Sequence, residues 1–294
     1  MNFLENELSK YYDSTCVAKI ISGLKSKRIS SFRVNTLKTT VDTVLQELDN
    51  NNISYTQVGV YDKAFLVEDL VSLQNLDIYK NGFIYVQNVS SMLPPLVLKP
   101  QAKDTILDMC ASPGGKTTQI ATITDNLASI TACEMNNIRI EKLKYNVNLQ
   151  GAKSVYVMNA DARNLDSFYS FDKILLDAPC SGSGTLDLSN DNYTKYFTPK
   201  LVEKSVKSQQ ALLKKAVSIL KKGGTLVYST CSILKAENEA VLESVLKDGS
   251  VVLEPIDKAM FLDIPLLPSL EHTITVCPSE VYEGFFVVKL KKIK

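Results

Sequence analysis

The sequence predicts an α/β fold in which a doubly wound, mostly parallel sheet follows a small α+β module. From about residue 105 onward, short apolar runs alternate with segments of helical periodicity, as in consecutive strand–helix units. Before residue 100 the pattern differs, with short strand-like runs around a helical segment at 39–51. We therefore expect the small module at 1–100 and the large domain at 101–294.

The elements of the large domain follow from these runs. Parallel strands need crossover connections, which the helical segments at 136–150 and 199–222 can provide. The run at 284–292 follows no helix, so we expect it to pair antiparallel. The other expected strands are 105–109, 129–134, 154–159, 173–178 and 224–229.

The composition, with 45% hydrophobic and 22% charged residues, is typical of a globular protein. No stretch approaches about 18 uninterrupted apolar residues, and the N-terminus lacks a secretory pattern. We therefore expect a cytoplasmic protein without a membrane partner. Six cysteines without CxxC pairs indicate reduced thiols, and the presence of one histidine, His272, argues against a structural zinc site.

The formal net charge is only +1, but basic residues gather locally. Residues 1–40 contain seven lysines and arginines against three acids, and residues 200–222 contain seven lysines against Glu203. Residues 285–294 add four lysines and no acid. Such stripes can follow the phosphates of a nucleic acid, or they can be ordinary solvated surfaces.

A glycine turn at 113–115 separates the strand that ends near Asp108 from a helix that begins near Lys116. A Walker phosphate loop would need a glycine at Cys110, and the G-x-G-x-x-G dinucleotide pattern is absent. Glycines let a ligand approach the backbone closely, and a helix N-terminus favours an anionic group. The turn is either a ligand-binding loop or a plain strand–helix connection.

Acidic residues follow the next strands: Glu134 ends the second, Asp161 follows the third and Asp177 ends the fourth. In an open parallel sheet these ends share one edge, where ligands bind. A carboxylate after the second strand can accept from both hydroxyls of a ribose, and one after the third can reach an adenine amino group. Each acid taken singly could instead cap a helix or face solvent.

Two cysteines end apolar runs, Cys180 in DAPCSGSGT and Cys231 in STCS. Few reactions need two thiols at adjacent strand ends beside a ligand loop, and methylation of a pyrimidine ring carbon is one. That carbon becomes nucleophilic only after a group such as a thiolate adds to its neighbour. Each cysteine taken singly could equally be a buried core residue.

Several segments together resemble a known enzyme family. In the order of the chain they are RVNTLK (33–38), VQNVSSMLPPLVL (86–98), DMCASPGGKTTQIA (108–121), DAPCSGSGT (177–185), STCSILKAENE (229–239) and EGFFVVKL (283–290). Over roughly residues 30–292 the chain thus resembles the NOL1/NOP2/Sun family of RNA (cytosine-5) methyltransferases, which includes the RsmB- and RsmF-type rRNA enzymes.

The resemblance implies a Rossmann-like methyltransferase domain with a seven-stranded, mostly parallel sheet, preceded by an RNA-recognition-like module. It implies S-adenosyl-L-methionine as donor and a cytosine of RNA as target, with rRNA slightly favoured over tRNA. We expect the chain to be a monomer. The donor-binding residues that the resemblance implies are Cys110, Ala111, Ser112, Pro113, Gly114, Gly115, Lys116, Glu134, Arg139, Asp161 and Asp177.

The resemblance also implies catalytic roles. Cys231 would be the nucleophile, Cys180 would assist release of the product, and Asp177 and Lys116 would hold the cytosine. The chemistry requires attack on ring carbon 6, methylation of carbon 5, relief of charge near ring nitrogen 3, and loss of the carbon 5 proton before elimination. Cys180 and Asp177 are both candidates for the last step, and the sequence does not rank them.

Three other classes of protein fit the sequence less well. A non-catalytic RNA-binding factor on the same fold would have lost the nucleophile or the donor loop. A DNA cytosine methyltransferase would attack through the cysteine of its PC motif and carry a large target-recognition insertion. A small-molecule N- or O-methyltransferase would need no paired thiols.

Overall fold

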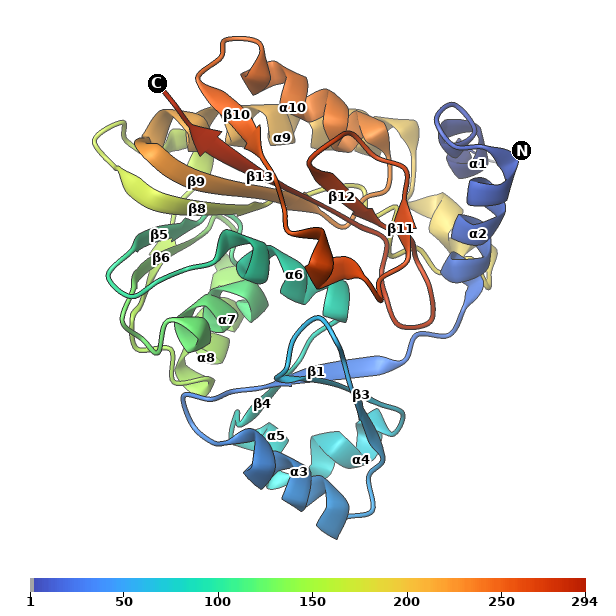
Figure 1. Ribbon diagram of the computed structural model, residues 1–294, viewed down its shortest axis with the longest axis vertical. Helices are drawn as coiled ribbons and strands as arrows, with labels where there is room; N and C mark the ends of the chain where they lie inside the picture. The colour runs from blue at the N-terminus through green and yellow to red at the C-terminus, as the bar shows by residue number, and fades with distance from the viewer. Residues whose placement is uncertain (1–2) are drawn as a thin grey trace.

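Nine strands form the large sheet of the computed structural model, which describes residues 3–294 (Figure 1). Five central strands run parallel in the order β7–β6–β5–β8–β9, as the strand–helix alternation predicts. On the far side of β9, β13 pairs antiparallel to it, which confirms the expectation for the last run. These strands are β5 (Thr105–Asp108), β6 (Ser129–Glu134), β7 (Val155–Asn159), β8 (Phe171–Asp177), β9 (Leu220–Thr230) and β13 (Phe285–Lys292).

The sheet has two strands more than the seven expected. The outer edge of β13 pairs with β12 (Thr273–Val276) along its first half and with β10 (Val251–Glu254) along its second. The short strand β11 (Leu266–Leu267) then pairs with β12. The short strands β10, β11 and β12, which lie between α10 and β13 in the chain, thus extend the antiparallel side of the sheet.

Helices cover both faces of the large sheet, so the molecule has three layers here (Figure 1). The reason is visible in β5, where successive residues point to opposite faces. Ile106 packs with α6, α7 and α8, whereas Leu107 packs with α9 and α10. These helices are α6 (Val89–Leu98), α7 (Gly115–Ile123), α8 (Asn137–Leu149), α9 (Pro199–Ile219) and α10 (Glu239–Leu246).

Helix α9 begins where the sequence predicts, because the Thr198 side chain accepts from the backbone N–H of Leu201 and Pro199 follows directly. It ends at Ile219, three residues before the expected end at 222. Leu220 already belongs to β9 and pairs with Phe171 of β8. Strand pairing therefore overrides the helical periodicity of the last lysines.

The small sheet lies apart from the large one, beneath α6 and α7 in Figure 1. Its antiparallel order is β2–β3–β1–β4, and with its helices it forms the β-α-β-β-α-β arrangement of ferredoxin-like and RNA-recognition folds. Its elements are β1 (Ser30–Val34), α3 (Val41–Asn50), β2 (Tyr55–Gln57), β3 (Ala64–Val67), α4 (Leu70–Asn75), α5 (Asp77–Lys80) and β4 (Ile84–Val86).

Both faces of the small sheet are covered. Phe32 and Val34 of β1 pack in a cluster with α3, α4 and α5. Arg33, between them, points the other way, and its guanidinium donates to the carbonyl of Gly115 at 2.9 Å and to the Thr118 hydroxyl at 2.7 Å. The face without helices therefore rests on α7 of the large domain.

The first two helices, α1 (Phe3–Leu8) and α2 (Ser14–Lys25), pack on the large domain rather than on the small sheet. Leu4 and Leu8 share a buried cluster with Phe197 and Ile233. Helix α6 likewise belongs to the core of the large sheet. That residues 1–100 bind RNA and residues 101–294 form the catalytic domain stays a prediction.

No helix within residues 3–294 is long and apolar enough to span a bilayer.

Candidate active site

The carboxyl ends of the parallel strands meet at one edge of the large sheet, and the predicted site residues gather there. Glu134 and Asp177 are the last residues of β6 and β8, and Asp161 follows β7 by two residues. Cys231 follows the last residue of β9, and Cys180 lies three residues beyond β8. The parallel order thus gathers side chains that are widely separated along the chain.

Two cavities open side by side at this edge. The first, of about 290 Å³, is lined by Glu134, Asp161 and both thiols, Cys180 and Cys231. The second, of about 250 Å³, is lined by Lys116, by β4 of the small sheet and by Glu283. Their linings share Cys110, Ser112 and Asp177, so the cavities adjoin.

The predicted loop at 110–116 forms the wall between the two cavities. Gly114 has φ of 108°, in the left-handed region that other residues rarely adopt, and caps the N-terminus of α7. A Cβ on Gly115 would lie 3.2 Å from the Tyr85 ring, so a side chain there would crowd the small sheet. The loop is tied to α8 because the Arg139 guanidinium donates to the Ser112 carbonyl at 2.8 Å.

The first cavity has two acids at its far end. Glu134 is 5% exposed, and its carboxylate accepts from the backbone N–H of Asn136 at 2.8 Å. Asp161 forms a bidentate pair with Arg163, with distances from 2.7 to 3.0 Å. Hydrogen bonds from the Arg163 side chain hold the pKa of Asp161 below its usual range. Both acids are held as oriented acceptors.

The two thiols touch. The Sγ atoms of Cys180 and Cys231 lie 3.2 Å apart. The hydrogen bond to Cys231, and then burial, raise the pKa of Cys180 well above its usual value. Cys180 therefore stays a neutral thiol and can donate its proton toward the sulfur of Cys231 or toward a ligand in the first cavity, which both thiols line.

An ion pair lies where the cavities meet. The Lys116 ammonium is 2.7 Å from the Asp177 carboxylate, whose other oxygen accepts from the Ser229 hydroxyl at 2.8 Å. Burial alone would lower the pKa of Lys116, but the charge of Asp177, the hydrogen bond to it and the charge of Asp108 together outweigh burial, and the pKa is raised. The pair offers a ligand both a donor and an acceptor.

Asp108 lies beneath the loop and is 1% exposed. One carboxyl oxygen accepts from the Thr117 hydroxyl at 2.7 Å, while Oδ1 has no hydrogen-bond partner among the described residues. Burial raises the pKa of Asp108 to about 6. The sequence pattern marked Asp108 only as the end of a strand, so its unpaired oxygen beside the second cavity is a structural finding.

Residues 95–291 match the family model described as 16S rRNA methyltransferase RsmB/F. The chain belongs to this family. It is 34% identical over 304 residues to the ribosomal RNA small subunit methyltransferase F of Shewanella loihica, which covers 99% of this chain and 62% of the relative. The tRNA (cytosine(72)-C(5))-methyltransferase of Pyrococcus horikoshii is 34% identical over 226 residues, which cover 76% of this chain and 56% of that protein. The chain thus spans about three fifths of the length of these relatives.

Solved structures agree with the family. The crystal structure of a methyltransferase homolog protein from Pyrococcus horikoshii superposes with a TM-score of 0.82 at 27% identity, and the match covers 100% of both chains. The fold of the whole chain, including the small sheet, therefore recurs in that protein.

Several residues of this RsmB/F-type site were missed by the sequence pattern. Arg163 stands in a turn after β7, and its only signal was its position two residues after Asp161. Tyr85, Gln87 and Glu283 line the second cavity, although they come from segments far from the thiols in the chain. Motif spacing within the large domain could not have placed them, because pairing of β13 and docking of the small sheet bring them in.

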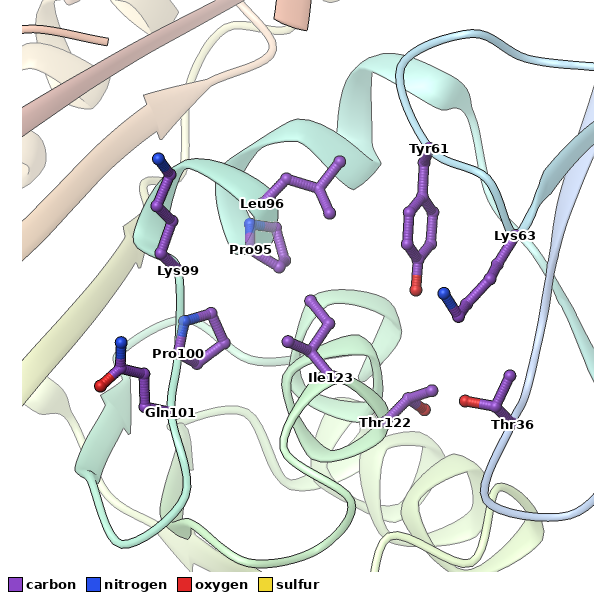
Figure 2. Close-up of a pocket in the computed structure, with 10 residues that line it drawn as sticks. All are labelled: Thr36, Tyr61, Lys63, Pro95, Leu96, Lys99, Pro100, Gln101, Thr122 and Ile123. Carbon is purple, nitrogen blue, oxygen red and sulfur yellow. The ribbon is translucent and has the colours of Figure 1, made fainter. Parts of the chain in front are cut away.

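A further cavity, of about 550 Å³, lies away from this site (Figure 2). Tyr61 and Lys63 of the small domain face Pro95 and Leu96 of α6 across it. The residues that line it include no thiol and no carboxylate. It borders the ends of α6 and α7 that lie opposite the thiols, so it contributes nothing to the site described above.

The lysine stripe at 200–222 is divided by the fold. Helix α9 starts beside the site edge and runs back to the opposite edge, because it connects two parallel strands. Lys200, Lys204 and Lys207 are exposed in its first half. Lys215 instead donates to the Leu165 carbonyl, and Lys221 pairs with Asp172. The first three lysines are thus exposed in the half of α9 that starts beside the site edge.

Proposed function

We propose that this chain transfers a methyl group from S-adenosyl-L-methionine to carbon 5 of a cytosine in RNA, through a covalent adduct with Cys231. The observation that carries the proposal is the 3.2 Å contact between the Sγ atoms of Cys180 and Cys231 beside a cavity with two oriented acids. Membership of the RsmB/F family supports the same reaction. The names of the relatives support RNA as the substrate, and rRNA more often than tRNA.

The residues present fit the donor. Glu134 can accept from the ribose hydroxyls, Asp161 can accept from the adenine amino group, and Arg139 holds the loop against α8. Cys110 and Ser112 of the loop line the same cavity as Glu134, so the methionine moiety can lie against this part of the loop. The unpaired Oδ1 of Asp108 can accept from its ammonium group. When bound, the donor supplies a methyl group on a positively charged sulfur.

The catalytic residues act on the ring in sequence. The thiolate of Cys231 adds to carbon 6, and the electron pair of the 5,6 double bond moves to carbon 5, which takes the methyl group. Lys116 and Asp177, held 2.7 Å apart, can hydrogen-bond to the base and stabilise the charge that develops on it. Loss of the carbon 5 proton then restores the double bond and expels the thiolate of Cys231.

Cys180 fits the release step. Its raised pKa keeps a proton on sulfur, 3.2 Å from the sulfur that must leave. As a water molecule takes the carbon 5 proton, Cys180 can protonate the departing Cys231 sulfur, and the Cys180 thiolate then regains a proton from that water. The Asp177 carboxylate already pairs with Lys116 and accepts a hydrogen bond from Ser229, which favours Cys180 for this step.

We propose that RNA crosses the site edge between the small domain at 1–100 and the first half of α9. The exposed Lys200, Lys204 and Lys207 supply positive charge there. The covered face of the small sheet leaves its edges and loops for RNA, since Arg33 docks that face on α7. Tyr85 and Gln87 of this domain line the second cavity, through which the target base, once it leaves its stack, can reach the thiols of the adjoining first cavity.

We further propose a monomer that works in the cytoplasm. All six cysteines are free, and the proposed reaction needs Cys180 and Cys231 as thiols, which a reducing compartment maintains. Size-exclusion chromatography with light scattering tests the oligomeric state, because a stable dimer would elute near twice the 32.6 kDa of one chain.

Transfer of a labelled methyl group tests the function. Purified protein, S-adenosyl-L-methionine labelled in its methyl group and total RNA from cells that lack the protein should give label in 5-methylcytosine after nuclease digestion. Cys231→Ala should abolish the label, whereas the control Cys277→Ala, at a thiol in the cluster with α2, should retain it. Label in another nucleoside, or an active Cys231→Ala protein, would refute the proposal.

A further inference from the structure

A buried carboxylate, Glu237, lies between the segments that present the two thiols. Its side chain is 0% exposed and ends the short helix η3 (Lys235–Glu237). One oxygen accepts from the backbone N–H of Ser181 at 2.7 Å. The other accepts from the hydroxyls of Ser181 at 2.5 Å and Ser232 at 2.6 Å. Since these serines directly follow Cys180 and Cys231, one side chain joins both thiol-bearing segments.

A second link runs through Ser183, whose Oγ is 2.8 Å from the Oγ of Ser232. The Ser183 hydroxyl accepts from the N–H of Ile233 at 3.0 Å, and the Ser232 hydroxyl accepts from the N–H of Leu234 at 3.1 Å. Because Ser232 donates its one hydroxyl proton to the Glu237 carboxylate, the bond between the two serines has Ser183 as its donor. The chain of hydrogen bonds has one direction and needs an acceptor at its end.

Hydrogen bonds from two other residues also hold Glu237 in place. The Gln209 side chain donates to it at 3.4 Å, and the Tyr228 hydroxyl donates to its backbone carbonyl at 2.6 Å. No lysine, arginine or histidine within residues 3–294 forms an ion pair with it. Burial of an unpaired carboxylate is costly, so a residue that served only to fill this space would be apolar.

We propose that Glu237 is a positioning residue that sets the separation of the Cys180 and Cys231 sulfurs. In the proposed reaction, on which this inference rests, the two thiols must address the same ring at once. A displacement of about 1 Å in such a pair can cost about 100-fold in rate. The geometry of the thiols can be measured without RNA or donor, which separates this inference from the proposed function.

Glu237→Gln keeps the shape of the side chain but places an NH₂ group where an oxygen accepts from Ser232. An NH₂ group cannot accept from the hydroxyls of Ser181 and Ser232, so the chain of hydrogen bonds loses the acceptor at its end. The probe is diamide, which takes one hydrogen from each thiol to form the disulfide and is itself reduced to the hydrazine. We expect the Cys180–Cys231 disulfide, mapped by mass spectrometry, to form at least about tenfold more slowly in Glu237→Gln than in the wild type.

The matched control is Glu239→Gln, two residues along, whose half-buried carboxyl interacts with the Leu270 backbone and with neither thiol segment. It should form the disulfide at the wild-type rate. With RNA and donor, Glu237→Gln should lower kcat at an unchanged KM for the donor. Equal disulfide rates in the two variants, at temperatures where both are folded, would overturn the positioning role even if methyl transfer is confirmed.

A second pair of variants decides the question if Glu237→Gln does not fold. Ser232→Ala removes the link from the Cys231 segment to Glu237, together with the hydrogen bonds of that hydroxyl to Ser183 and Leu234. Its control Ser244→Ala removes a hydroxyl that donates to the Val241 carbonyl in α10. Slower disulfide formation in Ser232→Ala alone supports the proposal. Equal rates in both would overturn it. If the wild-type protein transfers no methyl group, the rates of disulfide formation still test whether Glu237 positions the two thiols. Only the role of that positioning in methyl transfer would then be refuted.

Discussion

The ammonium of Lys116, on the first turn of α7, lies 2.7 Å from the carboxylate of Asp177 at the end of β8. The pair connects the loop at 110–116 to the end of β8, three residues before Cys180, and Asp177 lies where the two cavities meet. The same lysine donates to the Ser91 hydroxyl of α6 at 2.7 Å. One side chain thus fixes three elements around the place where the base would enter.

Lys116→Met should therefore lower both turnover and stability. The substitution leaves a partly buried carboxylate without its cation, which we expect to cost about 1–3 kcal/mol in the free energy of unfolding, since Ser229 still donates to Asp177. Urea denaturation measures this cost. The control Lys144→Met breaks an exposed pair with Glu141 and should cost less than about 0.5 kcal/mol. Similar losses in both would contradict the stabilising role of the buried pair.

Asp108→Asn should change how stability depends on pH. Wild-type Asp108 keeps its proton up to a pKa of about 6, whereas an unfolded aspartate has a pKa near 3.8. Its stabilising contribution is thus complete below about pH 4 and is lost as pH rises through 6, a change of at most about 3 kcal/mol. The variant should lack this loss, so its stability relative to wild type should rise between pH 4 and 7 in denaturation without donor.

Asp172→Asn should change the pH dependence of stability in the opposite direction. Hydrogen bonds from Lys221, and then from Thr105, lower the pKa of Asp172 to about 2. Its contribution is present above the unfolded pKa and is lost as pH falls toward 2. The stability of this variant relative to wild type should therefore fall as pH rises from about 2 to 5. If the stability of both variants relative to wild type changed in the same direction as pH rises, the assignment of opposite pKa shifts to Asp108 and Asp172 would be refuted.

The two cysteines should be distinguishable by what accumulates. Cys231→Ala lacks the attacking sulfur and should form no covalent RNA adduct. Cys180→Ala keeps attack and methyl transfer but loses the thiol 3.2 Å from the leaving sulfur, so the adduct should persist on denaturing gels. A trapped band with Cys231→Ala and none with Cys180→Ala would reverse the roles, as in the DNA cytosine enzymes.

Glu134→Ala should weaken binding of S-adenosyl-L-methionine by about 1–3 kcal/mol, because the two ribose hydroxyls of this ligand would lose a buried hydrogen-bond acceptor. Isothermal titration calorimetry measures the loss. Glu141→Ala, on the exposed face of α8, is the matched control and should bind as the wild type does. Equal affinity in the two variants would exclude Glu134 from the donor site.

The triple change Lys200→Ala, Lys204→Ala and Lys207→Ala should weaken RNA binding and reduce its dependence on salt. If all three contact phosphates of a single strand, the slope of log affinity against log salt should fall by about 2. Fluorescence anisotropy with a labelled RNA across salt concentrations gives the slope. Lys153 and Lys222 replaced by alanine form the control, since both are exposed near the amino ends of β7 and β9, at the opposite edge of the sheet. An equal change in slope there would refute the assignment.

The sequence by itself determined the local order of the large domain. Short apolar runs and helical spacing are local properties, so the alternation of strands and helices and the antiparallel last strand followed from them. The predicted donor loop, Glu134, Asp161, Asp177 and both thiols could be placed at one edge because parallel strands end together. The seven-strand estimate fell short because β10 and β11 gain stability only by pairing with strands already in place.

Only the tertiary structure decided which side chains meet across distant segments. Lys116 pairs with Asp177, and Glu237 joins Ser181 to Ser232, because the sheet brings the ends of β5, β8 and β9 together. The docking of the small sheet covers one of its faces and places Tyr85 in the second cavity. Such contacts depend on the packing of whole elements in three dimensions, a property that the spacing of residues along one chain does not contain.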